Sequence, residues 1–225
     1  RLVKRYPDSY YAGDAHQRLV FLRNKLAEQE ILLSEKEQRA RVVVAAEAQR
    51  RAQEEIDVGE AARILGARDI FFLPYIDPYM EINGIARRID IPLAGFAGAI
   101  DKYIRKIRPD LIITHGSNGE YGHPQHIYTH RATRLALANG HPQTALMSWS
   151  AWHRPCERER VLNPDDKADI VTDISPWHDM KVAAALCHKT QHAMFLRNSG
   201  APSVAEMVWT TEAFHIWQGP MPDDL

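Results

Sequence analysis

Residues 112–130 read IITHGSNGEYGHPQHIYTH, and this stretch carries most of the information about fold and function. Two apolar β-branched residues lead into Thr114, a segment with three glycines follows, and His123 opens a run with helical spacing. The pattern predicts a strand, a loop and a helix N-terminus, with polar side chains at the carboxyl end of the strand. Ligands of open α/β sheets bind at that end. The imidazoles of His123 and His126, on either side of a proline, suit a metal or acid–base site better than a core.

Around this stretch, helical and strand patterns alternate from residue 50 to about residue 192. Such alternation predicts an α/β fold with three layers, a mostly parallel sheet covered by helices in a Rossmann-like arrangement. We expect one domain over residues 1–225, in one interpretation without its first strand, with a charged helical segment at 14–49. The charges at 28–41 form either a solvated helix face or a contact in a homo-oligomer. The expected strands are 69–73, 111–114, 145–151 and 168–172, and the expected helices are 50–65, 94–107, 126–138 and 179–192.

The composition is that of an ordinary globular protein. Of the 225 residues, 45% are apolar and 25% are charged, and the formal net charge of −1 provides no electrostatic footprint for nucleic acid. No apolar run approaches the roughly 20 residues of a membrane-spanning helix, and the first residues lack the apolar core of a secretory signal. Cys156 and Cys187 form no C-x-x-C pair, so we expect two thiols in a cytoplasmic protein. The chain starts without Met, which leaves open a start within a longer protein or at a processed end.

Residues 114–126 (THGSNGEYGHPQH) resemble the second signature of the LmbE/PIG-L family, the zinc-dependent N-acetylglucosaminyl deacetylases. That signature usually reads Gly-x-Tyr-Gly-His-Pro-Asp-His after an apolar strand. Further phrases similar to the family occur in consistent order, so the resemblance covers roughly residues 50–192. These phrases are EAARILG at 60–66, DIFFL at 69–73, RPDLIIT at 108–114 and a Lys…Ala…His-x-Thr-Gln pattern at 181–191.

The resemblance implies a role for each matching residue. His126 would be a zinc ligand, while Tyr121 and His123 would face the substrate carbonyl. His123 would stabilise the oxyanion or donate a proton to the leaving amine. Bound zinc lowers the pKa of water to about 7, and a carboxylate base, at the position of Asp8, would direct that water at the amide carbon. The implied substrate-binding residues are Asn118, Glu120 and His188.

The first signature of the family, Ala-His-Pro-Asp-Asp-Glu, does not occur in this chain. Its nearest echo in the right order, at residues 6–9, keeps only Asp8. Two later phrases, Asn163-Pro-Asp-Asp166 and Met221-Pro-Asp-Asp224, contain the acidic pair without a histidine. Gln125 replaces the usual Asp of the second signature. Since a catalytic zinc normally has three protein ligands, the sequence leaves two of them unassigned.

Three explanations of the incomplete ligand set remain open. An upstream segment bears the first signature, or the metal site is rebuilt with Asp14, His16 or His115, or the chain is a degenerate member. The sequence predicts a zinc-dependent hydrolase that removes an acyl group from an N-acetylated amino sugar or related glycoconjugate amide. The alternative is a non-catalytic protein that binds carbohydrate or a protein partner. A phosphate loop at 116–122 is discounted, because it lacks the G-x-G-x-x-G spacing and the Walker lysine.

Overall fold

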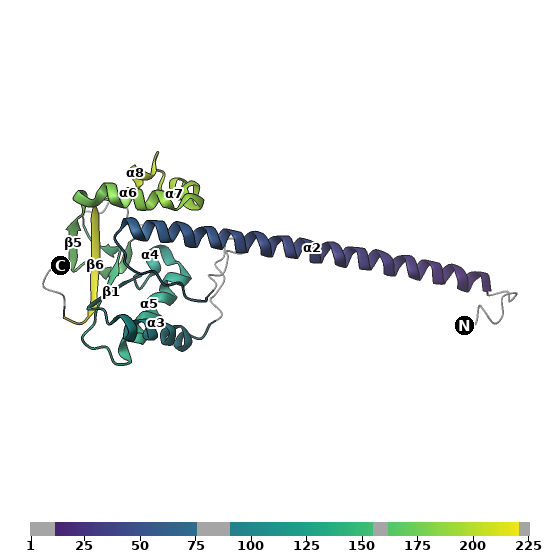
Figure 1. Ribbon diagram of the computed structural model, residues 1–225, viewed down its shortest axis with the longest axis horizontal. Coiled ribbons are helices and arrows are strands. Elements are labelled where there is room, and N and C mark those ends of the chain that lie inside the picture. Colours follow the sequence, from purple (N-terminus) through teal and green to yellow (C-terminus); the bar gives the residue numbers. More distant parts are fainter. Residues whose placement is uncertain (1–11, 76–90, 155–161, 221–225) are drawn as a thin grey trace. The chain divides into compact units, whose positions relative to one another are not determined.

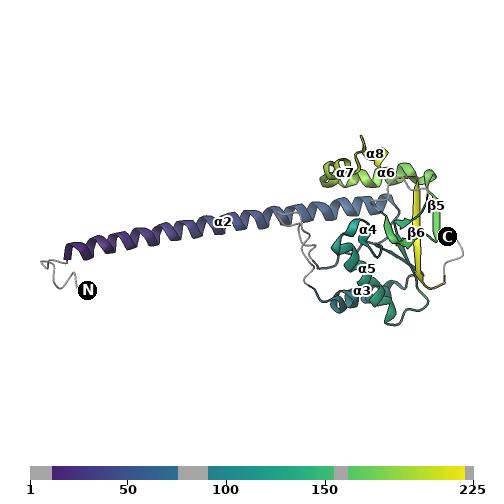
Figure 2. The same ribbon diagram turned by 180° about the vertical axis from the view of Figure 1, so that it is seen from behind.

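The structure, a computed structural model, describes residues 12–75, 91–154 and 162–220 (Figure 1; seen from behind in Figure 2). The longer helices are α2 (Ala12–Ile64), α3 (Leu93–Ile107), α5 (Pro124–Ala138), α6 (His178–Cys187) and α7 (His192–Ser199). Short helical turns form α4 (Gly119–Gly122), η2 (Ser175–Trp177), η3 (Lys189–Gln191) and α8 (Val204–Met207). The strands are β1 (Leu111–Thr114), β2 (Ala145–Trp149), β3 (Ala151–Trp152), β4 (Asn163–Lys167), β5 (Ile170–Asp173) and β6 (Thr211–Gln218). None of the described helices is both long enough and apolar enough to cross a membrane.

The contacts between residues divide the chain into two compact units, residues 1–58 and residues 59–225. The described part of the first unit consists of residues 12–58 of the helix α2, which runs without a break through residues 14–49. This helix ends at Ile64, and Gly66 follows with a φ of 83°, in the left-handed region that favours glycine. The second unit contains the sheet and the other helices.

Four strands form the main sheet in the order β1–β2–β6–β5. β1 and β2 pair in parallel, with Leu111 opposite Ala145, as the alternating pattern predicts for this part of the chain. β6 pairs antiparallel with both β2 and β5, so the sheet is mixed and the prediction of a mostly parallel sheet is corrected. Several short helices, rather than a single crossover helix, connect β5 to β6, and the chain re-enters the sheet in the opposite direction. The described fold is therefore mixed α/β.

Successive residues of β1 face opposite sides of the sheet, and each side meets different helices. Ile112 packs against a core built from α3, α5 and β2. Ile113 lies on the other side, where Trp177 and Met180, from η2 and α6, line the same hollow. The buried residues of the first core are Ala97, Ile104, Ala132, Ala136, Leu137 and Leu146. Because β1 and β2 run parallel, their carboxyl ends lie side by side, and the loop after β1 begins at that edge.

Two predicted elements differ in the structure. Residues 69–73, predicted as a strand, form none, because no strand in the described part of the chain pairs with them. The helix predicted at 179–192 is divided, because α6 ends at Cys187 and a 3₁₀ turn separates it from α7. Cys187 is a buried free thiol, as expected, whereas Cys156 lies outside the described residues.

Candidate metal centre

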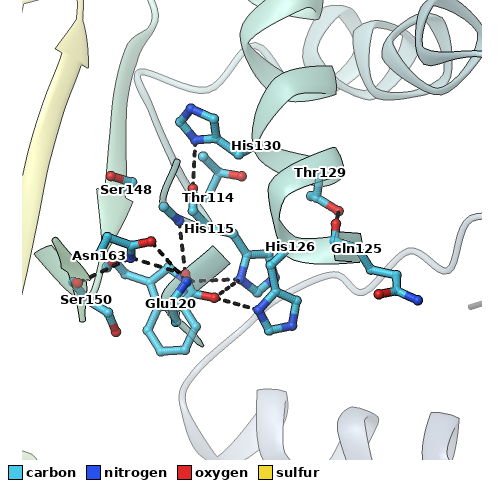
Figure 3. Close-up of polar contacts among 12 residues, drawn as sticks. Thr114, His115, Glu120, Gln125, His126, Thr129, His130, Ser148, Ser150 and Asn163 are labelled. Carbon is cyan, nitrogen blue, oxygen red and sulfur yellow. Dashed lines mark hydrogen bonds and ion pairs between the residues drawn. The ribbon is translucent and has the colours of Figure 1, made fainter. Parts of the chain in front are cut away.

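The loop after β1 folds back and brings an acidic side chain against two histidines (Figure 3). His115 directly follows β1, and His126 lies in the first turn of α5. Between them the chain turns through positive φ angles at Gly119 (62°), Glu120 (59°) and Gly122 (84°). Such angles are usual for glycine, whereas a glutamate in this conformation costs about 1–3 kcal/mol. The turn directs the Glu120 carboxylate toward both imidazoles.

Glu120 contacts both imidazoles through one oxygen. Its Oε2 atom lies 2.5 Å from Nδ1 of His126 and 3.2 Å from Nδ1 of His115. Its Oε1 atom accepts a hydrogen bond of 2.9 Å from the backbone N–H of Gly116. The two imidazole rings stack with their centroids 3.9 Å apart. The Glu120 side chain is 4% exposed, against 30% for His115 and 24% for His126, so a buried carboxylate lies behind two imidazoles that solvent still reaches.

The surroundings of Glu120 keep its carboxylate charged. Burial raises the pKa of Glu120, but the hydrogen bonds from His115, His126 and the Gly116 N–H lower this pKa by more, and the net result is well below the ordinary range. A buried anion needs charges or hydrogen bonds to compensate its lost hydration. Here the two imidazoles and one backbone N–H provide them.

Three side chains of this group offer ligand atoms within reach of a single metal ion. One ligand atom from each of His115, Glu120 and His126 lies within 4.8 Å of the other two. Two imidazole nitrogens and one carboxylate oxygen form the His₂Glu donor set of some catalytic zinc sites, which leave a fourth position for water or substrate. The donor set and its partial exposure fit a divalent metal ion, so this group could hold one.

The structure gathers several of the residues that the sequence singles out. His126, predicted as the zinc ligand, belongs to the group. Tyr121 and His123 adjoin it, with ring centroids 5.6 Å and 4.3 Å from that of His126. Glu120, predicted to bind substrate, lies among the potential metal ligands. Asp8, predicted as the base, lies outside the described residues.

Two other predicted residues lie apart from this group. The Asn118 carboxamide donates a hydrogen bond of 2.7 Å to Oδ2 of Asp165. His188 follows the last residue of α6, and its ring centroid lies 6.4 Å from that of Phe195. Neither belongs to the group of potential metal ligands found among the described residues. Gln125, in the first turn of α5, points away from Glu120 in Figure 3.

His115 is the member of the group that the family resemblance does not supply. The sequence offers His115 only as one option for a rebuilt site, together with Asp14 and His16. Those two residues lie in α2, and their side chains are not among those that the structure describes. The signal that could have favoured His115 is its place immediately after an apolar strand, where ligands of α/β sheets bind.

Two neighbours hold His115 in place. The buried His130 donates from Nδ1 to the backbone oxygen of His115, at 2.8 Å. Burial lowers the pKa of His130 below its ordinary value, although the bond to that oxygen raises it, so the ring is neutral at pH 7. On the other side, the indole nitrogen of Trp149 lies 3.3 Å from Nδ1 of His115, the atom that also faces Glu120. His130 thus supports a potential ligand and does not itself join the group.

An apolar hollow of about 380 Å³ adjoins the group at Trp149. Trp149 lines this hollow, and its ring centroid lies 5.8 Å from that of His115. The charged residues of the lining, Lys181 and Glu212, form an ion pair with each other. The rest of the lining consists of Leu65, Ile113, Ile174, Trp177, Met180 and Phe214. The volume and the aromatic lining are typical of small-molecule sites, and the hollow suits an uncharged part of a ligand.

The sequence is similar to a family of de-N-acetylases. The family model described as GlcNAc-PI de-N-acetylase (PIG-L) matches residues 6–137. A 1D-myo-inositol 2-acetamido-2-deoxy-alpha-D-glucopyranoside deacetylase from Mycobacterium sp. (strain KMS) is 31% identical over 125 residues, which are 47% of this chain and 41% of the relative. A protein of the same name from Saccharomonospora viridis is 30% identical over 161 residues, or 57% and 58% of the two chains. The chain thus spans about half the length of these relatives.

A solved structure of a different enzyme also overlays on the chain. The match to the 4-carboxy-2-hydroxymuconate hydratase GalB from Pseudomonas putida KT2440 covers 80% of this chain and 77% of the GalB chain, with a TM-score of 0.46 and 19% sequence identity. At this level of similarity the overlay carries no conclusion about fold or activity.

Proposed function

The chain belongs to the PIG-L family of GlcNAc-PI de-N-acetylases, and from this premise we propose that it is a zinc-dependent hydrolase of an N-acetylated amino sugar or related glycoconjugate amide. The single observation that carries the proposal is the convergence of His115, Glu120 and His126 within the matched family signature. The names of the relatives, which are amino-sugar deacetylases, support the same class of substrate.

In the proposed site, His115, Glu120 and His126 would hold the zinc ion. A bound zinc ion supplies Lewis acidity and a water molecule whose pKa is near 7. The Gly116 N–H fixes the second oxygen of Glu120, and His130 fixes the backbone of His115. Partners of this kind orient metal ligands and tune their affinity.

The residues beside His126 would assist the reaction. Amide hydrolysis joins a water oxygen to the carbonyl carbon and breaks the C–N bond, which releases a carboxylic acid and a free amine. His123 would stabilise the oxyanion or donate the proton that the leaving amine takes up. Tyr121, which is 62% exposed, would meet the carbonyl oxygen from the solvent side. Asp8 is proposed, from the family resemblance alone, as the base that takes the proton of the water.

The substrate would extend from the metal group toward Trp149. The hollow at Trp149 would receive an uncharged face of the sugar, since Lys181 and Glu212 neutralise each other there. Asn118 and His188 stay proposed contacts for more distant parts of the substrate. We also propose that the domain has the three-layer, Rossmann-like arrangement of helices that the alternating pattern predicts, around a mixed sheet.

Acetate release from an N-acetylglucosaminyl–inositol conjugate tests the proposal. We expect the full chain to bind one zinc ion and to release acetate, and His123→Ala to lose at least about 100-fold of the rate, the typical contribution of a general acid or base. His141→Ala, a histidine in the loop before β2, is the matched control and should keep the rate. Zinc binding and sugar binding without acetate release would favour the non-catalytic alternative. A chain that neither binds zinc nor releases acetate would overturn the proposal.

A further inference from the structure

The phrase Asn163-Pro-Asp-Asp166, which the proposed reaction does not use, forms most of strand β4. Asn163 and Asp166 are fully buried (0% exposed), whereas Pro164 and Asp165 between them are exposed. Buried polar side chains are hydrogen-bonded as a rule. The partners of these two side chains lie in the loop after β1 and around the end of β2.

Asn163 holds Glu120 at its backbone and approaches its side chain (Figure 3). Oδ1 of Asn163 accepts a hydrogen bond of 2.9 Å from the Glu120 N–H, and Nδ2 lies 3.5 Å from Oε1 of Glu120. The same Nδ2 donates to the backbone oxygens of Trp149 and Ser150, each at 3.2 Å. The carboxamide also packs directly on Gly116, where a Cβ atom would lie 2.0 Å from Cγ of Asn163. Asn163 therefore ties the loop and Glu120 to the end of β2.

Asp166 holds the loop at Ser117. Oδ2 of Asp166 accepts hydrogen bonds from the Ser117 N–H, at 2.8 Å, and from the Ser148 hydroxyl, at 3.0 Å. Oδ1 accepts a further bond from the Ser117 hydroxyl. The Ser148 hydroxyl accepts in turn from the indole N–H of Trp217, at 2.9 Å. These bonds compensate a fully buried carboxylate and connect the loop to β2 and β6.

We propose that Asn163 and Asp166 are positioning residues, which hold the loop at 115–120 so that the Glu120 carboxylate reaches both imidazoles. The inference rests on the proposed function, because it assigns these contacts to the metal group. Glu120 has a φ of 59° and a ψ of −69°, and such a conformation persists only where the surroundings over-determine it. The bonds from β4 to Ser117 and Glu120 provide that constraint on both sides of the turn.

A set of near-isosteric variants separates positioning from general stability. Asn163→Leu and Asp166→Leu keep the side-chain size and remove the hydrogen-bonding atoms. Asp166→Asn is the conservative variant, because its oxygen accepts from the Ser117 N–H while its amide donates to the Ser117 hydroxyl. Ser148→Ala is a milder variant that removes one bond to Asp166 from the core side. Thr144→Val is the matched control, since it removes a buried hydroxyl bonded to a backbone oxygen (3.1 Å) next to the opposite end of β2.

Hydrogen exchange of the metal-free full chain shows whether the backbone N–H groups of the loop at 115–120 stay hydrogen-bonded. We expect amide exchange within residues 115–120 to become about tenfold faster or more in Asn163→Leu and Asp166→Leu, because each frees a loop N–H from a strong acceptor. Ser148→Ala should show a smaller increase in the same segment, which keeps the test decisive where a leucine variant does not fold. Asp166→Asn and Thr144→Val should match the wild type. Unchanged exchange in Asn163→Leu, Asp166→Leu and Ser148→Ala would overturn the inference. An equal increase in Thr144→Val would overturn it too.

Zinc affinity, measured by chelator competition on the same proteins, tests whether the position of the loop affects metal binding. We expect about 10–100-fold weaker zinc binding in the two leucine variants, the usual cost of losing a residue that orients a ligand. Asp166→Asn should restore the affinity to near the wild-type value. Faster exchange with unchanged zinc affinity would overturn the positioning role and leave the proposed function in place. A wild-type chain without zinc would refute the proposed function, while the exchange data would still decide whether β4 positions the loop.

Discussion

The two ends of the parallel strands β1 and β2 each carry a contact between a histidine and a carboxylate. At the carboxyl ends, Nδ1 of His126 lies 2.5 Å from Glu120. Near the amino end of β2, Nε2 of His141 lies 2.6 Å from Asp101 of α3. Because these distances are almost equal, a short contact does not by itself identify a site that binds a ligand.

The two contacts differ in what else meets the carboxylate. Asp101 also pairs with the permanently charged Arg105, one helical turn away at 2.8 Å, so its charge is already matched. Glu120 is buried, faces two imidazoles and a backbone N–H, and sits at a costly backbone angle. Convergence of several donors on one carboxylate, maintained against backbone strain, is therefore the better indicator of a ligand site.

Replacing Glu120 should change zinc binding more than any other substitution at these two contacts. Glu120→Gln keeps the size of the side chain but removes its charge and places an amide N–H₂ near the two imidazoles. We expect the zinc affinity, measured by chelator competition, to fall by more than about 100-fold, beyond the range typical of supporting residues. The same change at the other end, Asp101→Asn, should leave the zinc affinity at the wild-type value. Equal affinities in Glu120→Gln and wild type would mean that the metal binds elsewhere.

Two glycines sharpen the contrast between the site loop and α3. A Cβ atom at Gly116 would lie 2.0 Å from the side chain of Asn163, whereas a Cβ atom at Gly98 of α3 would meet nothing within 4 Å. We expect Gly116→Ala to lower the free energy of unfolding by about 1–3 kcal/mol through overpacking. Gly98→Ala should raise it by about 0.5–1 kcal/mol, because alanine is the better helix former. Urea denaturation of the two variants measures both changes. A Gly116→Ala protein with the wild-type free energy of unfolding would contradict the close packing of the loop.

The parts of the fold that local chemistry determines could be predicted from the sequence. The strand expected at 111–114 occurs, and the helix expected at 126–138 occurs with its start two residues earlier, at Pro124, since an apolar run and helical spacing are local signals. The strand predicted at 69–73 and the mostly parallel sheet are wrong. Strand pairing depends on partners that are distant in sequence, such as β6, which runs antiparallel to both of its neighbours.

The same distinction applies to the candidate site. His126 could be singled out from its phrase, and His115 could be kept as an alternative from its place after a strand. That Glu120 joins them could not be predicted, because the direction of its side chain depends on a positive φ at a residue that is not glycine. The contacts of Asn163 and Asp166 could not be predicted either, because they join residues that lie 43 and 49 positions apart in the sequence.

The smallest expected effect concerns the pH dependence of the surface contact at Asp101. The pKa of Asp101 lies below its ordinary value of 3.8, chiefly because Arg105 donates a hydrogen bond to it and then because His141 does. A carboxyl group whose pKa is lower in the folded than in the unfolded chain stabilises the fold above the ordinary value, and that stabilisation is lost as the pH falls through the lowered one. Asp101→Asn should therefore lower the Tm slightly at pH 7, and the difference from the wild type should shrink toward pH 3. Circular dichroism melts at both pH values measure it, and added salt should also reduce the difference at pH 7, since the contact is near the surface. A Tm difference of equal size at pH 3 would mean that Asp101 stabilises the fold through packing and not through its charge. The contrast with the closely packed Glu120 would then be weaker.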